Sequence, residues 1–543
     1  MGNDSRRFLL AFVLSIGVMF LWTAFFSPKQ KPKPPGQAAS APTEAAKPAP
    51  APAPTEVPGV PTATAPAPNS PEETAVLSGN GFTATFSTWG GALKSLTLAG
   101  EKFRRKEGSG YVPIDLVRVT EGQPYPLSLS VIGEGGKEDD VAARAPMAIT
   151  ARDDRSVTFS GRLGDLEVSK VFRLTGRPYE IALSLQISGG QGGTVSLLYP
   201  TYLPPQVRSG GLLSFLSSAP IELVRPLCRA GQKTERYDPK PGKEPGRLAG
   251  PADWAGADQH YFVSAVFPKE PAGTCVLASG AAAGTGLAAI ALPLDQARRA
   301  DFTVYTGPKE LDTLRAYGRG FESAIDYGTV AGLFAFFARG LLYVMRWLHQ
   351  FVRNWGVAII LLTVLVRAVL FPLTYKSMQS MNEMRKLQPE IEKLKAKFGN
   401  DREKLNMAVM QMYQQHKVNP LGGCLPMLLQ MPIWFALYAA LQTSVELYRE
   451  PFLWIQDLTL KDPVYVLPLA MGVTSFLMQK LSPQPADSSQ AKMMLYFFPI
   501  FFTFIMLNVP AGLTLYIFVN NLLSIVQQQV MMKKMPPVAV TAR

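Results

Sequence analysis

The chain has 543 residues, of which 47% are apolar and only 17% are charged, and its formal net charge is +13. An average soluble domain has about 25% charged residues. The composition excludes a disordered chain, and the presence of only three cysteines excludes a disulfide scaffold. The length indicates more than one domain. The basic balance is compatible with nucleic acid, a membrane surface or acidic partners, and the location of the charges decides among them.

The N-terminus predicts a membrane anchor followed by a tether. Residues 8–26 carry no charge, and Arg6 and Arg7 precede them. This uncharged segment is about as long as a membrane-spanning helix. A cleaved signal peptide is the alternative, but the apolar run is long for one and lacks a good cleavage site. We expect a signal anchor over 1–27 with a cytoplasmic N-terminus, and a Pro/Ala-rich tether outside the cytoplasm over 28–75.

Residues 76–327 predict a β domain outside the cytoplasm. Short segments with alternating apolar residues recur between Gly and Pro turns, for example at 81–87, 166–172, 179–185 and 260–267. Period-2 alternation between turn signals is typical of antiparallel strands in a β-sandwich. About 250 residues are enough to build a core of their own.

Few residues of this domain carry chemistry. Cys228 and Cys275 either form a disulfide in an oxidising compartment or remain two separate thiols, because the sequence does not show whether they are close. His260 is the only histidine of the domain, and a metal site needs several converging ligands, so a structural role is favoured. A scaffold or partner-docking role is therefore expected for the domain.

Residues 328–354 predict an amphipathic helix at the membrane surface. Arg339, Arg346 and Arg353 are seven residues apart and so share one helix face, while Phe, Leu and Trp occupy the rest. A membrane span is the alternative, but two arginines inside one span are costly. We therefore expect an interfacial helix whose arginines reach the polar headgroups.

The remainder, 355–534, predicts a core of five spans, followed by a short cytoplasmic tail at 535–543. With the N-terminal anchor the total is six spans, and both termini are cytoplasmic. The five spans are expected at 355–375, 422–443, 464–481, 493–509 and 512–531.

Loop charges agree with that topology. The loop at 376–420 has nine basic and five acidic residues, whereas the segment 444–463 has two basic and four acidic residues. Positive charge is therefore concentrated on the predicted cytoplasmic side, as the positive-inside rule requires. Most of the basic excess is explained by topology, without a nucleic-acid ligand.

Arg367 is the only charged residue within the 355–375 span. An arginine at membrane depth costs roughly 2.5–3.5 kcal/mol on insertion scales, so it is expected to face protein or a water-filled cavity. Snorkelling toward the inner surface is the alternative. Other polar residues in the spans could line the same cavity or merely join helices by hydrogen bonds; these are Gln430, Gln442, Thr443, Asn508, Asn520 and Asn521.

The loop at 376–420 predicts a cytoplasmic helical hairpin. Apolar residues recur every three or four positions on both sides of Gly399, which can end the first helix, and Asn400 or Asp401 can cap the second. Pro389 is expected to start or kink a helix. The methionines of this loop form either an adaptable surface for partners or the core of the hairpin.

Several motifs in order along the chain resemble the YidC/Oxa/Alb family of bacterial membrane protein insertases. These motifs are Arg367 with residues 371–374 (FPLT), residues 384–389 (MRKLQP), residues 419–441 (NPLGGCLPMLLQMPIWFALYAAL), residues 467–474 and residues 521–529. The likeness covers the whole chain, in the domain order of the Gram-negative members: an anchor, a tether, a large periplasmic domain and a five-span core. It implies a polytopic α-helical protein of the inner membrane with a five-helix insertase core and a large periplasmic all-β supersandwich.

The resemblance also implies how such a protein acts. A hydrophilic groove, open to the cytoplasm and to lipid but closed to the periplasm, would receive a substrate segment near Arg367. The implied groove residues are Arg367, Thr363, Gln430, Tyr516, Gln442 and Asn521. The free energy of insertion would come from burial of apolar substrate surface, at about 25 cal/mol per Å², and no enzymatic reaction, cofactor or metal is implied.

Family partners would be nascent membrane proteins, the Sec translocon with its accessory proteins, the translating ribosome and the lipid bilayer, with no sequence-specific nucleic acid. Ile517 stands where the family usually has a second tyrosine, and the tail after Lys534 is short. We therefore expect the hairpin, more than the tail, to contact the ribosome or the nascent chain. The expected contact residues are Met384, Arg385, Lys386, Lys393, Lys395 and Lys397.

Two other function classes fit parts of the sequence. Arg367 could serve a transporter or channel for an anionic solute, although the chain shows no internal repeat of the kind common in transporters. Alternatively, the β domain could carry the function as a carbohydrate-binding or envelope-assembly module.

Overall fold

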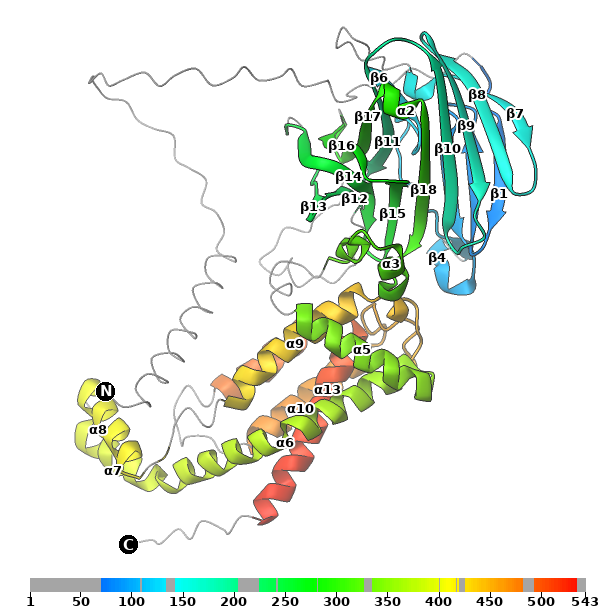
Figure 1. Cartoon of the computed structure of the whole chain (residues 1–543). Coiled ribbons are helices and arrows are strands. Elements are labelled where there is room, and N and C mark those ends of the chain that lie inside the picture. The colour runs from blue at the N-terminus through cyan, green and yellow to red at the C-terminus, as the bar shows by residue number, and fades with distance from the viewer. Residues whose placement is uncertain are drawn as a thin grey trace, which may run out of the picture. The chain divides into compact units, whose positions relative to one another are not determined.

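The computed structural model describes residues 70–107, 110–132, 142–203, 224–240, 243–280, 282–326, 335–399, 401–416, 418, 425–481 and 493–534 (Figure 1). The predicted anchor at 1–27, the tether as far as residue 69 and the tail at 535–543 lie outside these residues. Strands predominate up to residue 308, and helices predominate from residue 335 onward.

The first part is a β domain in which neighbouring strands pair antiparallel. Its strands are β1 (Thr74–Gly79), β2 (Phe82–Ser87), β3 (Ala92–Leu98), β4 (Arg104–Glu107), β5 (Gly110–Pro113), β6 (Leu129–Ile132), β7 (Ala148–Arg152), β8 (Ser156–Leu163), β9 (Leu166–Leu174), β10 (Glu180–Gly189), β11 (Thr194–Tyr202), β12 (Val224–Ala230), β13 (Lys233–Arg236), β14 (Gly246–Gln259), β15 (Phe262–Pro268), β16 (Ala272–Ser279), β17 (Thr285–Pro293) and β18 (Arg299–Pro308). Two short helices, α2 (Leu294–Ala297) and α3 (Leu311–Tyr317), accompany them. The four alternating segments predicted as strands correspond to β2, β9, β10 and β15.

Most strands belong to one large sheet. Its main path runs β6-β11-β17-β16-β14-β15-β18-β10-β9-β8-β7, and β12 and β13 join through β14. A separate sheet, β1-β2-β3, contributes Phe86 to the core, where its ring lies 4.3 Å from that of Phe172 in β9. The alternation in β9 explains this packing, because Leu166, Val168 and Phe172 all point inward and are buried.

Lys170 occupies an inward position of β9 and is fully buried. Its ammonium nitrogen donates hydrogen bonds to the carbonyl oxygens of Gly90 at 2.7 Å, Gly91 at 3.2 Å and Leu127 at 2.7 Å. Gly90 has a φ of 75°, and a Cβ there would lie 2.5 Å from the carbonyl oxygen of Ala143, so this turn requires glycine. Lys170 thus satisfies three buried carbonyl groups of two loops.

We expect the stability of the β domain to depend on pH through Lys170. Burial lowers the pKa of Lys170 to about 7, whereas an unfolded lysine titrates near about 10.4. Between these values the unfolded chain holds a proton that the folded chain releases, so the free energy of unfolding should rise with pH. Urea unfolding at several pH values should show a steeper rise in the parent protein than in Lys170→Met, in which the buried Lys309, whose pKa is also lowered by burial, still contributes.

Lys170→Met also leaves three carbonyls without a donor and lowers stability throughout, so the diagnostic quantity is the slope against pH. Lys233→Met is the matched control, because Lys233 is an exposed lysine of the same domain. An equal slope in the parent protein and in Lys170→Met would contradict the assignment.

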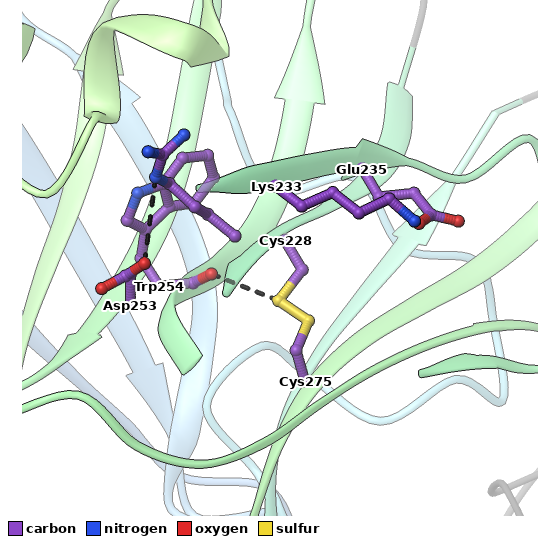
Figure 2. Close-up of a disulfide and its surroundings, with 7 residues drawn as sticks. Cys228, Lys233, Glu235, Asp253, Trp254 and Cys275 are labelled. Carbon is purple, nitrogen blue, oxygen red and sulfur yellow. Dashed lines mark hydrogen bonds and ion pairs between the residues drawn. A yellow bond between two sulfur atoms is a disulfide. The ribbon is translucent and has the colours of Figure 1, made fainter. Parts of the chain in front are cut away.

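Cys228 in β12 and Cys275 in β16 form a disulfide, which decides between the two possibilities left by the sequence (Figure 2). Both cysteines are buried, and both strands pair with β14, which brings the two Cα atoms to 6.4 Å. The bond joins positions 47 residues apart. It therefore fixes β12 to β16 across β14 inside the core.

The second part of the structure is a set of helices. They are α5 (Ala335–Val352), α6 (Trp355–Lys386), α7 (Gln388–Phe398), α8 (Arg402–Gln415), α9 (Leu425–Thr443), α10 (Val466–Leu481), α12 (Phe498–Met506) and α13 (Ala511–Lys534). Asp401 caps α8 by accepting a hydrogen bond from the Lys404 amide at 3.1 Å, and Pro389 lies in the first turn of α7. Both features agree with the sequence predictions for the hairpin.

α6 is longer than the predicted span, because it continues from 375 to Lys386. The loss of hydrophobicity after Tyr375 marks the end of the apolar stretch, and the helix itself continues through polar residues. Pro372 lies inside the helix without ending it. The predicted hairpin at 376–420 therefore begins with the last turns of α6.

One helix among the described residues, Trp355–Met384, is long and apolar enough to cross a membrane by length and composition. The apolar helices Gln430–Leu441, Val466–Leu481 and Leu495–Met506 are shorter. Helix lengths therefore do not establish the six predicted spans. Large apolar side chains such as Val369 and Ile500 are nevertheless exposed on the helices, as expected where lipid is the solvent.

Helix α5 differs from the expected row of three snorkelling arginines. Arg346 is tied into the protein, because its guanidinium pairs with Asp312 at 3.1 Å and with Glu446. Arg353 lies beyond the end of α5 with a φ of 51°, so it does not continue the helix face. Arg339 is exposed. The buried face of α5 is apolar and includes Leu342 and Met345.

Candidate functional site

Polar side chains from three helices meet inside the helical core. Arg367 of α6 donates a hydrogen bond from Nε to Oδ1 of Asn520 at 2.7 Å. Its Nη2 donates to the carbonyl oxygen of Asn520 at 3.2 Å and to the hydroxyl of Ser524. The guanidinium is therefore held by α13 through an amide, a carbonyl and a hydroxyl.

The partners of Arg367 follow from the helix period. Tyr516, Asn520 and Ser524 are four residues apart, so they lie on one face of α13. The side-chain amide of Gln430 in α9 donates a hydrogen bond to the hydroxyl of Tyr516, which is buried. We call Arg367, Gln430, Tyr516, Asn520 and Ser524 the polar cluster; it connects α6, α9 and α13.

Among the described residues, nothing compensates the positive charge of the polar cluster. Within the described ranges, no carboxylate lies within ion-pair distance of Arg367, and its Nη1 makes no hydrogen bond. A guanidinium presents five N–H donors in a fixed planar arrangement. Arg367 therefore keeps the capacity to bind a further acceptor, above all an anionic one.

The two halves of the helical core differ in polarity. Toward the residues that join α9 to α10, the buried apolar side chains include Ile359, Leu362, Leu441 and Leu513. The buried hydroxyls of Thr363 and Thr514 in this half bond backbone carbonyls one turn earlier along the chain. Toward the α7–α8 hairpin, α10 and α13 place Ser475 and Asn521 in hydrogen-bond contact at 2.8 Å. The polar cluster thus lies where the apolar half gives way to the polar half.

The remaining predicted groove residues are placed differently. Thr363 is buried one turn before Arg367, and its hydroxyl bonds the carbonyl of Ile359 in its own helix at 2.7 Å. Asn521 is buried against Ser475 of α10 and does not bond Arg367. Gln442 lies in α9, but its side chain is outside the described part of the structure.

The sequence indicates Asn520 only as one of several polar residues that could line the cavity, and it does not indicate Ser524, although both residues hold Arg367. The signal that could have indicated them is the four-residue spacing from Tyr516 along one helix face. Their distance in sequence from Arg367, 153 and 157 residues, conceals the contact itself. A pattern of spacing alone does not show which helix lies opposite.

The hairpin residues divide into a core and a surface. Met384 packs with Leu387, Met412 and Val418 in a small apolar cluster of the hairpin. Lys386, Lys393, Lys395 and Lys397 are exposed, and the side chain of Arg385 is outside the described part of the structure. Met384 thus contributes to the hairpin core, whereas the lysines form a basic surface.

The described residues contain no group of three or more His, Cys, Asp or Glu side chains that could hold a metal ion. The polar cluster has hydrogen-bond donors and acceptors, and it contains neither a carboxylate nor a histidine. Such a set can bind and orient a polar or anionic segment by hydrogen bonds and charge.

Comparison with known proteins covers both parts of the chain. The family model "60Kd inner membrane protein" matches residues 347–538, and the model "YidC periplasmic domain" matches residues 76–344. A relative from Anaeromyxobacter dehalogenans (strain 2CP-C), named membrane protein insertase YidC, is 66% identical over 539 residues and 98% of both chains. A relative of the same name from Geotalea daltonii is 36% identical and covers 98% of this chain and 99% of its own.

Solved structures show weaker likeness. The crystal structure of an active YidC insertase with its first transmembrane domain resolved has 18% identity and a TM-score of 0.38, covering 85% of this chain and 93% of its own. A putative aldose 1-epimerase from Escherichia coli K12 has 13% identity and a TM-score of 0.27, covering 44% of this chain and 99% of its own. At these TM-scores neither structure defines the fold or the chemistry of this chain.

Proposed function

The chain belongs to the YidC family of membrane protein insertases, and from that premise we propose that its polar cluster receives the hydrophilic part of a substrate during insertion. The protein is an inner membrane protein with a periplasmic domain, and its clients are nascent membrane proteins. The alternative function, an anion transporter, has no support, because the relatives that match this chain over its full length are named as insertases.

The observation that carries the proposal is the charge of Arg367, which has no carboxylate partner among the residues that the structure describes. A substrate segment bound for the periplasm must leave water, and unpaired polar groups are costly in hydrocarbon. Arg367 and the amide and hydroxyl groups around it provide polar partners for such a segment at membrane depth. The groove thus lowers the free-energy cost of moving the polar substrate segment into the membrane. The apolar substrate helix next to that segment then partitions into lipid.

The free energy of insertion comes, in this proposal, from burial of the apolar substrate helix in the bilayer, at about 25 cal/mol per Å². No covalent step is required, and the protein acts as a chaperone and conduit without an enzymatic reaction. The apolar half of the helical core would close the groove toward the periplasm. Its buried residues Leu362 and Leu513 are apolar, and the nearby Thr514 hydroxyl already bonds the carbonyl oxygen of Pro510, so this half offers a polar segment few partners.

The proposed topology has six spans, with both termini in the cytoplasm. The charge difference between the 376–420 loop and the 444–463 segment supports it. In this arrangement the α7–α8 hairpin is cytoplasmic, and its exposed lysines 386, 393, 395 and 397 are available to the ribosome or to the nascent chain. We place the Sec translocon and its accessory proteins among the partners on the family resemblance alone.

Crosslinking of a stalled nascent membrane protein tests the groove. A photoreactive residue at Gln430, which is partly accessible, should crosslink to the substrate. Crosslinks from Thr363 and Tyr516 should also form, although both are buried in the free protein, because substrate entry must separate α9 from α13. The readout is the mass shift of the labelled nascent chain on a gel.

Val369 provides the matched control, because it lies two residues after Arg367 and is 69% exposed on the outer surface of α6. A probe at this position should react with lipid and give little substrate adduct. Absence of adducts from all three groove positions, or equal adducts from Val369, would contradict the groove.

A further inference from the structure

The connection between α9 and α10, residues 444–465, has two unlike parts. Its first part packs against the β domain: the ring of Tyr448 lies 5.1 Å from that of Tyr261 and 5.9 Å from that of Phe262. Lys102 of the β domain pairs with Glu450 at 2.8 Å. Because the β domain is the periplasmic domain, the connection lies on the periplasmic side of the membrane.

The second part, residues 453–465, exposes large apolar side chains. Leu453 is 75% exposed, and Val464 is 57% exposed. Trp454, Leu460 and Tyr465 are exposed as well. The β domain already contacts the first part of the connection, yet these side chains remain uncovered. Large apolar side chains that are exposed together in one short segment indicate an interaction site.

The acidic side chains of this part are turned inward. Asp457 accepts hydrogen bonds from the amide and hydroxyl of Thr459, at 2.8 and 2.6 Å. Asp462 is buried and accepts from the Leu467 amide at 2.7 Å and from the indole of Trp454 at 3.1 Å. Neither carboxylate therefore contributes negative charge to the exposed face of this segment.

One charged side chain, Lys461, remains exposed between 453 and 465, a segment that the structure describes completely. Its ammonium lies 5.7 Å from the centre of the Tyr465 ring. An exposed face with apolar residues, a tryptophan, a tyrosine and a lysine matches the composition found where proteins meet lipid headgroups. The single positive charge suits a lipid phosphate.

The backbone is held in a conformation that presents these side chains. Leu453 has a φ of 52° and Tyr465 a φ of 57°, which are uncommon for residues other than glycine. Beyond Tyr465 the exposed apolar surface continues along α10 through Val466, Leu469 and Val473. The surface of the connection is therefore continuous with a helix surface suited to lipid.

We propose that residues 453–465 form a lipid anchor in the periplasmic leaflet of the inner membrane. Leu453 and Val464 enter the boundary of the acyl chains, Trp454 and Tyr465 lie at headgroup level, and the Lys461 ammonium binds lipid phosphate. The anchor fixes the depth at which α10 begins, and the first part of the connection transmits that depth to the β domain. It is independent of substrate binding at the polar cluster.

Spin labelling of the full-length chain in vesicles of phosphatidylethanolamine and phosphatidylglycerol tests the anchor. A nitroxide is attached to Leu453→Cys or Val464→Cys in a Cys424→Ser background, since Cys228 and Cys275 are paired. Collision with lipid-soluble oxygen and with a water-soluble nickel chelate is then measured. Both labels should favour oxygen several-fold over a label at Asp295→Cys, an exposed position of the β domain.

A label at Val473→Cys, on the exposed side of α10, provides the lipid reference. Nickel accessibility at 453 and 464 equal to that at 295 would overturn the proposal in favour of a solvated loop. Protection from both reagents would also overturn it, because the face would then be covered by protein. Wild-type insertion activity of the labelled variants would show that the fold is retained, and failure of the groove model would leave the collision result unchanged.

Discussion

Arg367→Ala should reduce insertion of substrates whose translocated segment is acidic by roughly ten- to a hundredfold. A hydrogen bond to a charged group contributes about 1.5–3 kcal/mol, and each 1.4 kcal/mol is about tenfold in an equilibrium. Neutral segments should lose much less, because they meet the remaining amide and hydroxyl groups of the cluster. The measurement is protease protection of matched substrates, differing only in acidic residues, in vesicles containing the purified protein.

Two variants separate the charge from its setting. Arg367→Lys keeps the charge but cannot reproduce the contacts of Nε and Nη2 with Asn520 and Ser524, so it should retain part of the preference for acidic segments. Arg339→Ala removes an exposed arginine of α5 and controls for net charge. Equal losses for acidic and neutral substrates in Arg367→Ala would assign the arginine a structural role.

Removal of the Cys228–Cys275 disulfide should lower the free energy of unfolding of the β domain by about 4 kcal/mol, by the chain-entropy relation for a closed loop of this length. The two cysteines are 47 residues apart and buried. The double change to alanine avoids burying new hydroxyl groups. Guanidinium unfolding of the protein, followed by circular dichroism of the strands, measures the shift in the midpoint.

Chemical reduction of the parent protein should reproduce the alanine variant, since both release the same loop. Reduction of the alanine variant should change nothing, which controls for effects of the reductant. An unchanged midpoint after removal of the bond would contradict a stabilising role.

The sequence predicted the β domain well where alternation is strong. In β9 the inward series Leu166, Val168, Phe172 is visible in the letters themselves. The same alternation places Lys170 inward, but only the fold reveals the three carbonyl groups that it meets. The cysteine pairing was also beyond the sequence, since it depends on β12 and β16 both adjoining β14.

The candidate site likewise contains residues that the sequence indicates and residues that only the fold reveals. A lone arginine in an apolar stretch is conspicuous in the sequence, so Arg367 could be found without a structure. Its partners Asn520 and Ser524 depend on which face of α13 meets α6, and no periodicity encodes that choice. For Asn521, a neighbour in sequence of Asn520, the helix turns the side chain by about 100° per residue, toward Ser475 of α10.

The strand order of the β domain sets when that domain can finish folding as the chain emerges. Strands β7 to β10 are successive neighbours and can pair early, but β10 also pairs with β18, whose last residue is Pro308. The hydrogen bond from the Ser184 hydroxyl to the Asp301 carboxylate can therefore form only after a further 117 residues have emerged. Long-range pairing of this kind is slow. The pairing of β10 with β18 can therefore form only after nearly the whole domain has crossed the membrane. The next long helix to emerge is α5.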